Sequence, residues 1–594
     1  MLYLCYFSLS FILCFSITPF VRYIAGQKGW VAQPRKDRWH KKPTALMGGI
    51  AIYIAISLPL FFLCLTTSGS VYPVAWSGIT LLFILGVLDD FIRLKPQSKL
   101  IGQILVASMV TFFNFRFHWF NSLTIDTIIT IVWIVGVTNA LNLIDNMDGL
   151  CAGVGFISGF CLSLLYMGNF PEPLILALIL AGATLAFLFF NFNPASIFMG
   201  DCGSLIIGFT LSFLTLIYPA HAKNINPISM YAVPLLILLV PIFDTTLVTL
   251  IRLLSGRKAS QGGRDHTSHR LVLMGFSEKK AVSFLYGITL ISGVSSVFVS
   301  KSDSLTSPAV IIPVFLSIIL MGVYLSQIRV YPEKEFSVLR DKSYTPILIE
   351  LTYKRQLLLV ILDFCIISFA YYLSYRLRFD SNAFPFYFKV FLRSLPAIIA
   401  CKFIAFFVIG IYRGIWTFLS SNDGFVYLKA SFAATVLSVV CVTFIYRFQS
   451  FSKGIFLIDF LLTTGFILFS RFSFRFFDET IKRRTLSGDL VLIYGAGRGG
   501  EILLREILNN KSLNIKPLGF IDDNTLKVGK SIYGYSVMGT FNDIEAIHKK
   551  NNISGILISF HDKDNDRFDK IKLFCKENEL FLKCFSVHLE EIDL

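Results

Sequence analysis

Gly86-Val87-Leu88-Asp89-Asp90-Phe91 ends an apolar segment with two adjacent carboxylates, where a membrane helix should leave the bilayer, and is the most informative stretch of the chain. Ionisable side chains at membrane depth are costly, so such a pair indicates a functional site. Two further apolar segments close on acidic and amide side chains, in the stretches Asn139-Ala140-Leu141-Asn142-Leu143-Ile144-Asp145-Asn146-Met147-Asp148-Gly149 and Asn193-Pro194-Ala195-Ser196-Ile197-Phe198-Met199-Gly200-Asp201. Three such clusters at three helix ends predict one site that binds a cation and phosphates.

The composition indicates a membrane protein with many spans. Of 594 residues, 55% are hydrophobic and only 15% are charged, whereas a soluble domain usually carries about 25% charged residues. The net charge of +16 does not indicate nucleic acid, because the Lys and Arg lie mainly between apolar segments, as the positive-inside rule expects. The 11 Cys include no Cys-x-x-Cys pair, so neither a disulfide framework nor a zinc site is expected.

About 11 spans are expected before residue 330, since roughly 20 apolar residues cross a bilayer. They centre near residues 11, 55, 82, 107, 134, 158, 181, 210, 241, 291 and 317. The first lacks a basic start and a small-residue cleavage site, so it is expected to stay as a helix in the lipid bilayer. The basic loop from Arg22 to Lys42 should be cytoplasmic. Alternation then places the three acidic clusters and the loop from Arg252 to Lys280 on that same face.

The second half has a membrane part and a soluble part. A polar, basic connector at 331–356 is the predicted boundary, and four apolar segments follow near 357–376, 387–411, 425–446 and 454–470. From about Ser487 the sequence alternates strands and helices, with strands expected at Asp489–Tyr494, Pro517–Ile521 and Ile553–Ser559 and a helix at Glu501–Leu508.

The predicted fold class is a polytopic α-helical membrane protein of about 11 + 4 transmembrane helices with a C-terminal cytoplasmic α/β Rossmann-like domain. The predicted domains are a multi-spanning domain at 1–330, a linker at 331–356, a four-helix membrane domain at 357–480 and the Rossmann-like domain at 487–594.

The acidic clusters suit phosphoryl transfer, which needs positioning, a divalent cation and neutralisation of negative charge. Magnesium usually takes one or two carboxylates plus substrate phosphates, and lysine or arginine side chains bind phosphates as cations. In the series Asn139, Asn142, Asp145 and Asp148, residues three apart share one face if the turn stays helical. Candidate carboxylates are Asp89, Asp90, Asp145, Asp148 and Asp201, and candidate cations are Lys99, Arg35 and Lys36.

Residues 1–330 resemble the polyprenyl-phosphate N-acetylhexosamine-1-phosphate transferases, membrane enzymes that move a sugar-1-phosphate from a UDP-sugar to undecaprenyl phosphate and release UMP. The motifs occur in order: Arg35-Lys36 with His40, Pro43 and Gly48-Gly49; Asp89-Asp90 with Lys99; the Asn-x-x-Asn-x-x-Asp-x-x-Asp-Gly pattern from Asn139 to Gly149; Asn191 to Ser204; and Asp244 with Asp265-His266-Thr267-Ser268-His269-Arg270. The family loop often reads His-x-His-His, and here its middle histidine is Ser268, which cannot carry charge and leaves the sugar preference open.

The resemblance implies roles. Asp201 would ligate Mg²⁺ or Mn²⁺, and Asp89 or Asp90 would act as base toward the lipid phosphate or as a second metal contact. Phe198 would stack on uracil, Lys99 would bind a phosphate, and Asn142, Asp145 and Asp148 would hold the nucleotide side. Further expected substrate contacts are Asn139, Asn191, Arg35, Lys36, Asp265 and Arg270, and further expected catalytic residues are His266 and His269. Direct attack by the lipid phosphate is favoured over an aspartyl-phosphate because it needs fewer steps.

Each residue taken alone has a plainer interpretation. A single Asp at a helix end is usually a cap, the histidines are ordinary loop residues, and Phe198 is packed or lipid-facing. A lipid-linked sugar transporter would also carry acidic residues, but near the bilayer midplane, whereas these lie at one face. A non-catalytic scaffold or regulator of polysaccharide assembly is the other alternative.

In the second half, Gly495-Ala496-Gly497-Arg498-Gly499-Gly500 lies between a predicted strand and a predicted helix. Gly495, Gly497 and Gly500 fit Gly-x-Gly-x-x-Gly, which predicts a pyrophosphate at the helix N-terminus. Asp522 follows the next strand and is a candidate contact for a ribose hydroxyl. A nucleotide or NAD(P) is therefore the candidate ligand, and a Rossmann-like fold without a ligand is the alternative.

Residues 345–594 also resemble the N-terminal half of membrane-bound nucleotide-sugar 4,6-dehydratases. The likeness lies in Tyr375–Asp380, Tyr412–Trp416, Ser470-Arg471 and Gly519–Asn524. The Tyr-x-x-x-Lys module of those enzymes is not found after Gly495, so dehydratase activity is not expected.

Together the two resemblances imply an enzyme of the bacterial inner membrane that transfers N-acetylhexosamine-1-phosphate, or that of a deoxy derivative, to undecaprenyl phosphate. Its expected partners are undecaprenyl phosphate, a UDP-N-acetylhexosamine and the bilayer, with a second copy of the chain or polysaccharide-assembly proteins as candidate protein partners. The expected product starts O-antigen or capsule, and cell-wall precursor synthesis is the less favoured pathway.

Overall fold

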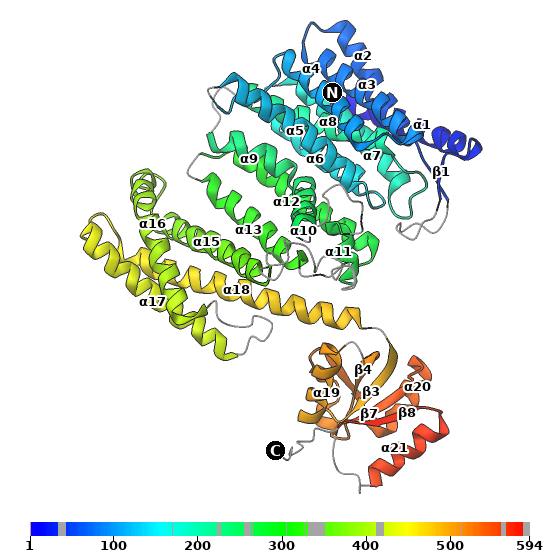
Figure 1. Cartoon of the computed structure of the whole chain (residues 1–594), viewed down its shortest axis with the longest axis vertical. Coiled ribbons are helices and arrows are strands. Elements are labelled where there is room, and N and C mark those ends of the chain that lie inside the picture. Colours follow the sequence, from blue (N-terminus) through cyan, green and yellow to red (C-terminus); the bar gives the residue numbers. More distant parts are fainter. Residues whose placement is uncertain are drawn as a thin grey trace, which may run out of the picture. The chain divides into compact units, whose positions relative to one another are not determined.

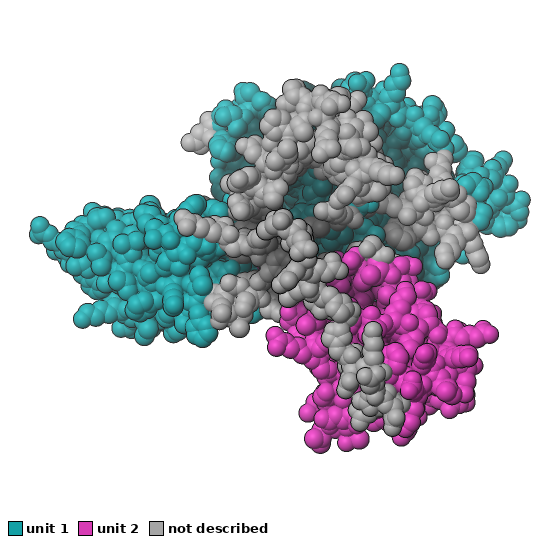
Figure 2. All heavy atoms as spheres, turned by 60° about the horizontal axis from the view of Figure 1, so that its bottom comes forward, with its two compact units in different colours: residues 1–472 teal, residues 473–594 magenta. Residues whose placement is uncertain are grey.

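The computed structural model describes residues 2–33, 43–120, 122–168, 170–221, 227–254, 263, 265–303, 306–326, 328, 330, 351–411, 421–486, 488–510, 513–559 and 566–585 (Figure 1). These residues form two compact units, 1–472 and 473–594 (Figure 2). Unit 1 contains the predicted domain at 1–330 and most of the predicted four-helix membrane domain, up to residue 472. Three residues of the predicted first loop, Arg35, Lys36 and His40, lie outside the described residues.

Unit 1 is helical apart from a short antiparallel pair, β1 (Val31–Ala32) with β2 (Thr44–Ala45). Its helices before residue 330 are α1 (Leu2–Gln27), α2 (Gly49–Thr66), α3 (Val71–Ile92), α4 (Pro96–Phe112), α5 (Leu123–Ile144), α6 (Leu150–Tyr166), α7 (Pro171–Asn191), α8 (Asp201–His221), α9 (Pro227–Ile237), α10 (Leu239–Leu254), α11 (Thr267–Leu273), α12 (Glu278–Lys301) and α13 (Ser307–Ser326). Those after the connector are α15 (Leu351–Arg378), α16 (Phe384–Ile409), α17 (Ser421–Tyr446) and α18 (Lys453–Thr485), which continues past residue 472 into unit 2.

The prediction of a multi-pass helical membrane protein is confirmed. Among the described residues, 12 helices are long and apolar enough to cross a membrane, or 13 if α9 and α10 form one span. Each predicted centre falls in a helix, but α4 and α6 have only 17 residues each. The total of about 15 spans therefore stays a prediction.

The segment near residue 241 differs from the single span that we predicted. α9 and α10 meet at an angle of 76°. Pro234 lies inside α9, and Pro241 follows in the first turn of α10. A proline lacks the N–H of the helix ladder and clashes with the preceding turn, so two of them close together bend the segment. The bend directly precedes Asp244.

α8 is the central helix of the first part of unit 1, since 94% of the stretch Asp201–Tyr218 is buried. It packs against both α3 and α5. Gly86 lets α3 approach α8, since a Cβ there would lie 2.4 Å from Cys202 Cα, and Gly49 lets α2 approach α8, since a Cβ there would lie 2.3 Å from Gly203 N. Gly203 is therefore part of the close contact between α2 and α8.

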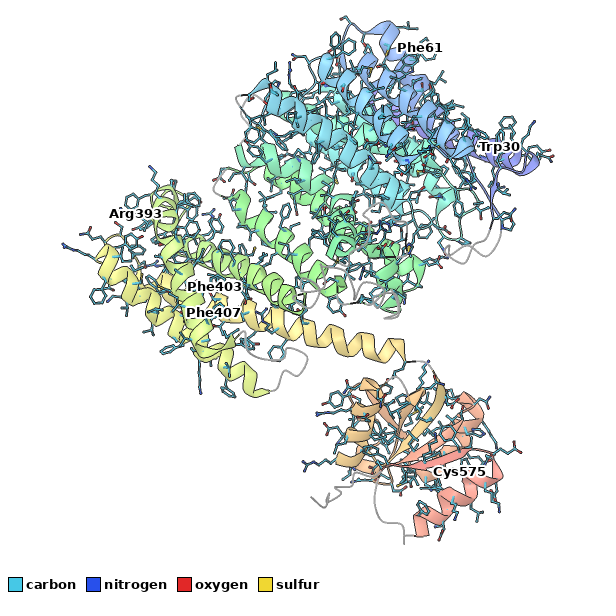
Figure 3. All side chains as sticks on the ribbon, viewed as in Figure 1. Trp30, Phe61, Arg393, Phe403, Phe407 and Cys575 are labelled. Carbon is cyan, nitrogen blue, oxygen red and sulfur yellow. The ribbon has the colours of Figure 1, made fainter. Side chains whose placement is uncertain are left out.

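The helices α15–α18 enclose an aromatic core with two buried ion pairs. Lys402 Nζ lies 2.7 Å from Asp459 Oδ1, and Arg471 Nη2 lies 2.6 Å from Asp363 Oδ2. Arg393, Phe403 and Phe407 mark α16 in Figure 3, and Phe407 is 61% exposed. An exposed aromatic ring on a span-length helix is what a lipid-facing surface requires.

Unit 2 is a sheet with helices on both faces, which confirms the predicted sheet-containing C-terminal domain. The strands are β3 (Asp489–Tyr494), β4 (Ile515–Ile521), β5 (Ser531–Ile532), β6 (Tyr535–Gly539), β7 (Gly555–Ile558) and β8 (Phe581–Cys584), and the helices are α19 (Arg498–Asn509), α20 (Ile544–Asn551) and α21 (Asp566–Glu577). The strand order is β5-β6-β4-β3-β7-β8, and every pair except β5–β6 is parallel.

Two hydrophobic clusters hold the helices of unit 2 to the sheet. Leu504 and Ile507 of α19 pack with Val491 and Ile493 of β3. Ile544 of α20 and Cys575 of α21 (Figure 3) belong to a second cluster with Leu492 and Tyr494 of β3. Successive residues of a strand point to opposite faces, so β3 is covered on both sides, as its continuous apolar sequence predicts.

Candidate active site

Lys99 on α4 joins side chains from three other helices. Its Nζ lies 3.0 Å from Asp89 Oδ2 at the end of α3 and donates to Asn142 Oδ1 of α5 at 3.3 Å. It also forms an ion pair with Oδ2 of Asp201, the first residue of α8. We call Asp89, Lys99, Asn142 and Asp201 the lysine cluster. The structure thus brings together four of the residues predicted from the sequence.

The orientation of the Asn142 amide is set by its neighbours. Its Nδ2 donates to Asp201 Oδ1 at 2.8 Å and to Ser204 Oγ at 2.9 Å. The amide oxygen therefore points to the lysine. This orientation keeps three oxygen atoms from three helices around one cationic group.

An amide pair lies about one helical turn from Lys99 and Asn142. It joins Gln103 of α4 to Asn139 of α5. Gln103 Nε2 donates to Asn139 Oδ1 at 3.2 Å, and Asn139 Nδ2 donates back to Gln103 Oε1 at 2.6 Å. Gln103 is buried. The pair therefore fastens α4 to α5 beside Lys99 and Asn142. Sequence reasoning missed Gln103, although it lies four residues after Lys99 and so on the same helix face.

Asp90 faces the N-terminus of α8. Its Oδ1 accepts the Asp201 N–H at 3.0 Å, and its Oδ2 accepts the Cys202 N–H at 3.1 Å. A carboxylate stabilises the orphan N–H groups and the positive end of a helix. Gly200 turns the chain there with a φ of +74°. These contacts favour a positioning role for Asp90 over the metal ligation or base role predicted from the sequence.

The turn after α5 does not stay helical, so the predicted face holds only Asn139 and Asn142. Asp145 ends the helix with φ −74° and ψ 45°. Asp148 Oδ2 accepts from Asn193 Nδ2 at 3.2 Å and from Ala195 N at 3.0 Å.

Asn191 also contacts the chain's own loops. Its Oδ1 accepts from Gly149 N at 3.1 Å, and its Nδ2 donates to Ile197 O at 2.9 Å. The observed contacts of Asp148 and Asn191 are thus internal, and their contacts with a substrate stay predictions. The same holds for half-buried Phe198, whose N–H donates to Ala45 O at 2.8 Å.

The predicted histidine loop forms the start of α11 and is held by Asp244. Asp244 Oδ2 lies 2.7 Å from His266 Nδ1, and its Oδ1 accepts the Thr267 N–H at 2.6 Å. The rings of His266 and His269 stand edge to face with their centroids 6.0 Å apart. Both histidines are buried. Ser268 Oγ donates to Asn146 Oδ1 at 2.7 Å, and this contact joins the loop to the turn after α5.

Asp265 and Arg270 are bound inside the protein. Arg252 donates to both carboxylate oxygens of Asp265, at 2.8 and 2.7 Å. Burial alone would raise the pKa of Asp265, but this contact outweighs burial and lowers it. Arg270 donates to the carbonyls of Asp265, Leu325 and Ile328. Substrate contacts by Asp265 and Arg270 stay predictions, and the observed contacts tie α11 to the end of α13.

In unit 2, the glycine loop after β3 packs against its own backbone. A Cβ on Gly500 would lie 2.0 Å from Gly495 O, and a Cβ on Gly499 would lie 2.2 Å from Ser559 O. Gly495 has a φ of +104°, whereas nothing lies within 4 Å of a Cβ on Gly497. The loop is therefore packed on one side and open at Gly497.

Asp522 holds this loop in place. Its Oδ2 accepts from Ala496 N and from Lys527 Nζ, both at 2.8 Å, and its Oδ1 accepts from Asn524 N at 2.9 Å. Burial raises the pKa of Asp522, but these three donors outweigh it and lower the pKa. Its observed partners are thus protein groups, and the predicted ribose contact stays a prediction.

The comparisons with known proteins identify the family. The family described as glycosyl transferase family 4 matches residues 72–218. A probable undecaprenyl-phosphate N-acetylglucosaminyl 1-phosphate transferase of Bacillus subtilis is 34% identical over 333 residues, which are 53% of this chain and 89% of that protein. The chain belongs to glycosyl transferase family 4. The matched residues run from α3 to α8. All four residues of the lysine cluster lie within this matched region.

Two further relatives have different names. A decaprenyl-phosphate N-acetylglucosaminephosphotransferase of Mycolicibacterium smegmatis is 30% identical over 325 residues, 48% of this chain and 80% of that protein. A phospho-N-acetylmuramoyl-pentapeptide-transferase of Oceanobacillus iheyensis is 28% identical over 309 residues, 47% of this chain and 91% of that protein. Outside family 4, a family described as a CoA-binding domain matches residues 408–577.

Proposed function

We propose that this chain transfers N-acetylhexosamine-1-phosphate, or that of a deoxy derivative, from a UDP-sugar to undecaprenyl phosphate and releases UMP. The convergence of the lysine cluster from four helices carries the proposal. Membership of family 4 and the names of the relatives support a polyprenyl phosphate acceptor and a sugar-phosphate donor. We further propose that the product starts a surface polysaccharide such as O-antigen or capsule.

Magnesium, or manganese, fits the lysine cluster. Asp89 and Asp201 offer carboxylate oxygens, and Asn142 offers an amide oxygen, all gathered around one cationic group. Magnesium usually takes one or two carboxylates and completes its shell with water and substrate phosphates. A bound metal would neutralise charge that develops on the diphosphate.

The remaining residues would orient the reactants. Asp89 Oδ1 accepts from Leu94 N at 2.8 Å and Asp90 is engaged with the N-terminus of α8, so we assign Asp89 Oδ2 to the metal. The base role predicted for Asp89 or Asp90 stays a prediction. Lys99 would meet a phosphate of the donor. Because Nδ1 of His266 is bonded to Asp244, Nε2 is the nitrogen that would meet the pyrophosphate or the sugar. Direct attack of the lipid phosphate on the donor requires no further residue.

We propose that the site lies at the cytoplasmic face of the bacterial inner membrane. The basic loop that begins at Arg22 and the loop from Arg252 to Lys280 support this orientation.

For unit 2 we propose a ligand that carries a nucleotide diphosphate, such as NAD(P), at the glycine loop. The open side of the loop at Gly497 and the match to a CoA-binding domain support such a ligand. We propose that this ligand serves a sensing or recruiting role.

The test is UMP release by the purified chain in detergent with undecaprenyl phosphate, magnesium and UDP-sugars offered singly. We expect lipid-dependent release with one sugar and its loss in Asp201→Asn. Arg505→Gln is the matched control, since Arg505 lies on α19 of unit 2 and its side chain is 56% exposed. Absence of release by folded protein with every UDP-sugar would favour a non-catalytic scaffold. Movement of a lipid-linked sugar without UMP release would favour a transporter.

A further inference from the structure

Lys99 occupies the centre of the oxygen set that a divalent cation would use. Its ammonium contacts Asp89, Asp201 and Asn142, which come from three different helices. These are the same oxygen atoms that we assign to the metal. An ammonium and a magnesium ion cannot share them at close range, because two cations a few ångströms apart repel each other.

The lysine also stabilises the site before a metal binds. Asp89 and Asp201 both approach the Lys99 nitrogen, so the two carboxylates lie close enough to repel each other without it. Two carboxylates and one ammonium carry a formal charge of −1. Adding a divalent cation changes this to +1, and a diphosphate ligand then offsets the excess positive charge. Metal and diphosphate are therefore each bound better when the other is present.

The side chains around Lys99 suit a movement of the ammonium. Lysine has a flexible four-carbon stem and three donors, whereas Asn142 is held by Asp201 and Ser204 through its Nδ2. When the ammonium turns toward a phosphate, the Asn142 oxygen stays directed at the metal position. The lysine is the mobile member and the amide is the fixed one.

We propose that Lys99 is a built-in counter-ion that competes with the metal and leaves the two aspartates when a diphosphate offers it a new partner. This inference rests on the proposed function. It makes metal binding and nucleotide binding cooperative, with Lys99 as the residue that couples them. Because such coupling is reciprocal, UDP and the metal raise each other's affinity by the same factor.

The test is Mn²⁺ binding to the full chain in detergent, measured by electron paramagnetic resonance of free Mn²⁺ without and with UDP. For the unmodified chain we expect weak Mn²⁺ binding alone and about fivefold or greater tightening with UDP. Lys99→Met removes the charge without adding a ligand atom. It should bind Mn²⁺ alone several-fold more tightly than the unmodified chain, and the gain from UDP should shrink.

Two variants control for charge. Lys99→Arg keeps the cation and should keep Mn²⁺ binding weak without UDP. Lys95→Gln removes an exposed positive charge from the residue that precedes α4, and its Mn²⁺ affinity should not change. Thermal unfolding gives a second readout: Lys99→Met should melt lower than the unmodified chain without metal, and Mn²⁺ should raise its midpoint more.

The outcomes separate this inference from the proposed function. If the unmodified chain releases UMP but Lys99→Met binds Mn²⁺ no more tightly, the counter-ion role is wrong and the transferase stands. Equal tightening by UDP in both proteins would also overturn it. If the unmodified chain binds Mn²⁺ as proposed but releases no UMP with any donor, the proposed reaction fails while the competition remains.

Discussion

Ser268 of α11 donates a 2.7 Å hydrogen bond to Asn146, four residues beyond Asn142. This contact joins the histidine loop to the turn that follows α5. Ser268 is buried, and Asn146 is half-buried. The residue that departs from the usual family loop thus has a defined partner on another part of the site.

Ser268→Ala should loosen the histidine loop. It removes the donor of one buried hydrogen bond, and the expected loss of stability is about 1 kcal/mol. UMP release should fall severalfold through a higher KM for the UDP-sugar. Steady-state kinetics across donor concentrations checks this, and Ser268→Thr, which keeps a hydroxyl, should retain most of the activity. Equal kinetics in Ser268→Ala and the unmodified chain would remove the loop contact from the site.

Asp90 and Asp201 should differ in their effect on metal binding. Asp90→Ala removes the acceptor for two N–H groups at the start of α8, and loss of a helix cap costs about 0.5–2 kcal/mol. We expect a lower thermal midpoint and only a modest loss of Mn²⁺ affinity. Asp201→Asn should abolish Mn²⁺ binding with little change in stability. If Asp90→Ala abolished Mn²⁺ binding in folded protein, Asp90 would be a metal ligand after all.

Gln103 and Asn139 should behave as a coupled pair. Gln103→Leu leaves a partly buried amide without its partner, at a cost of about 1–3 kcal/mol, whereas replacing both residues by apolar ones restores much of that loss. A double-mutant cycle with Asn139→Leu, read by thermal unfolding, should therefore be strongly non-additive. Additive effects would show that the two amides are not paired in the membrane protein.

The Arg252–Asp265 pair should act on stability in a pH-dependent way. The lowered pKa of Asp265 means that the pair stabilises the fold above the ordinary aspartate pKa of about 3.9. That stability is lost as the pH falls through the pKa of Asp265 in the folded protein, which is lower than the ordinary value. Between about pH 6 and 8 the contribution is therefore constant.

Arg252→Met tests the pair by leaving a buried carboxylate without its guanidinium, which costs about 3–5 kcal/mol. In this variant the midpoint of thermal unfolding should be lower than in the unmodified chain at every pH between about 6 and 8. It should recover partly on acidification, because Asp265 then takes up a proton. The double variant Arg252→Met/Asp265→Leu should melt higher than Arg252→Met at neutral pH. A drop that is the same at every pH in Arg252→Met would contradict the assignment.

Several parts of the site follow from patterns that do not depend on the tertiary fold. The polar clusters that contain Asp89, Asn142 and Asp201 are visible in the sequence beside apolar segments, and the structure brings the ends of α3 and α5 to the start of α8. The glycine loop after β3 and the four helices α15–α18 were predictable for the same reason, since length, hydrophobicity and glycine spacing are local properties. Gln103 was missed because one amide within an apolar segment does not reveal its partner.

Local sequence patterns gave wrong predictions where a turn decides the direction of a side chain or of a helix. Asp148 was expected on a helical face with Asn142, but α5 ends at Ile144, and Asp148 binds the loop at Asn193 and Ala195 instead. The bend between α9 and α10 depends on two prolines, yet the hydropathy of that segment is that of one span.

From the sequence alone we could predict a helical membrane protein that resembles this family and carries acidic residues at helix ends. Hydropathy and motif spacing are properties of the linear sequence and do not depend on the tertiary structure. It did not determine which member of the pair Asp89-Asp90 faces the lysine. Adjacent residues on a helix point about 100° apart, so the rotation of α3 decides. The contact of Gly86 with α8 sets that rotation, and it turns Asp89 to Lys99 and Asp90 to the N-terminus of α8.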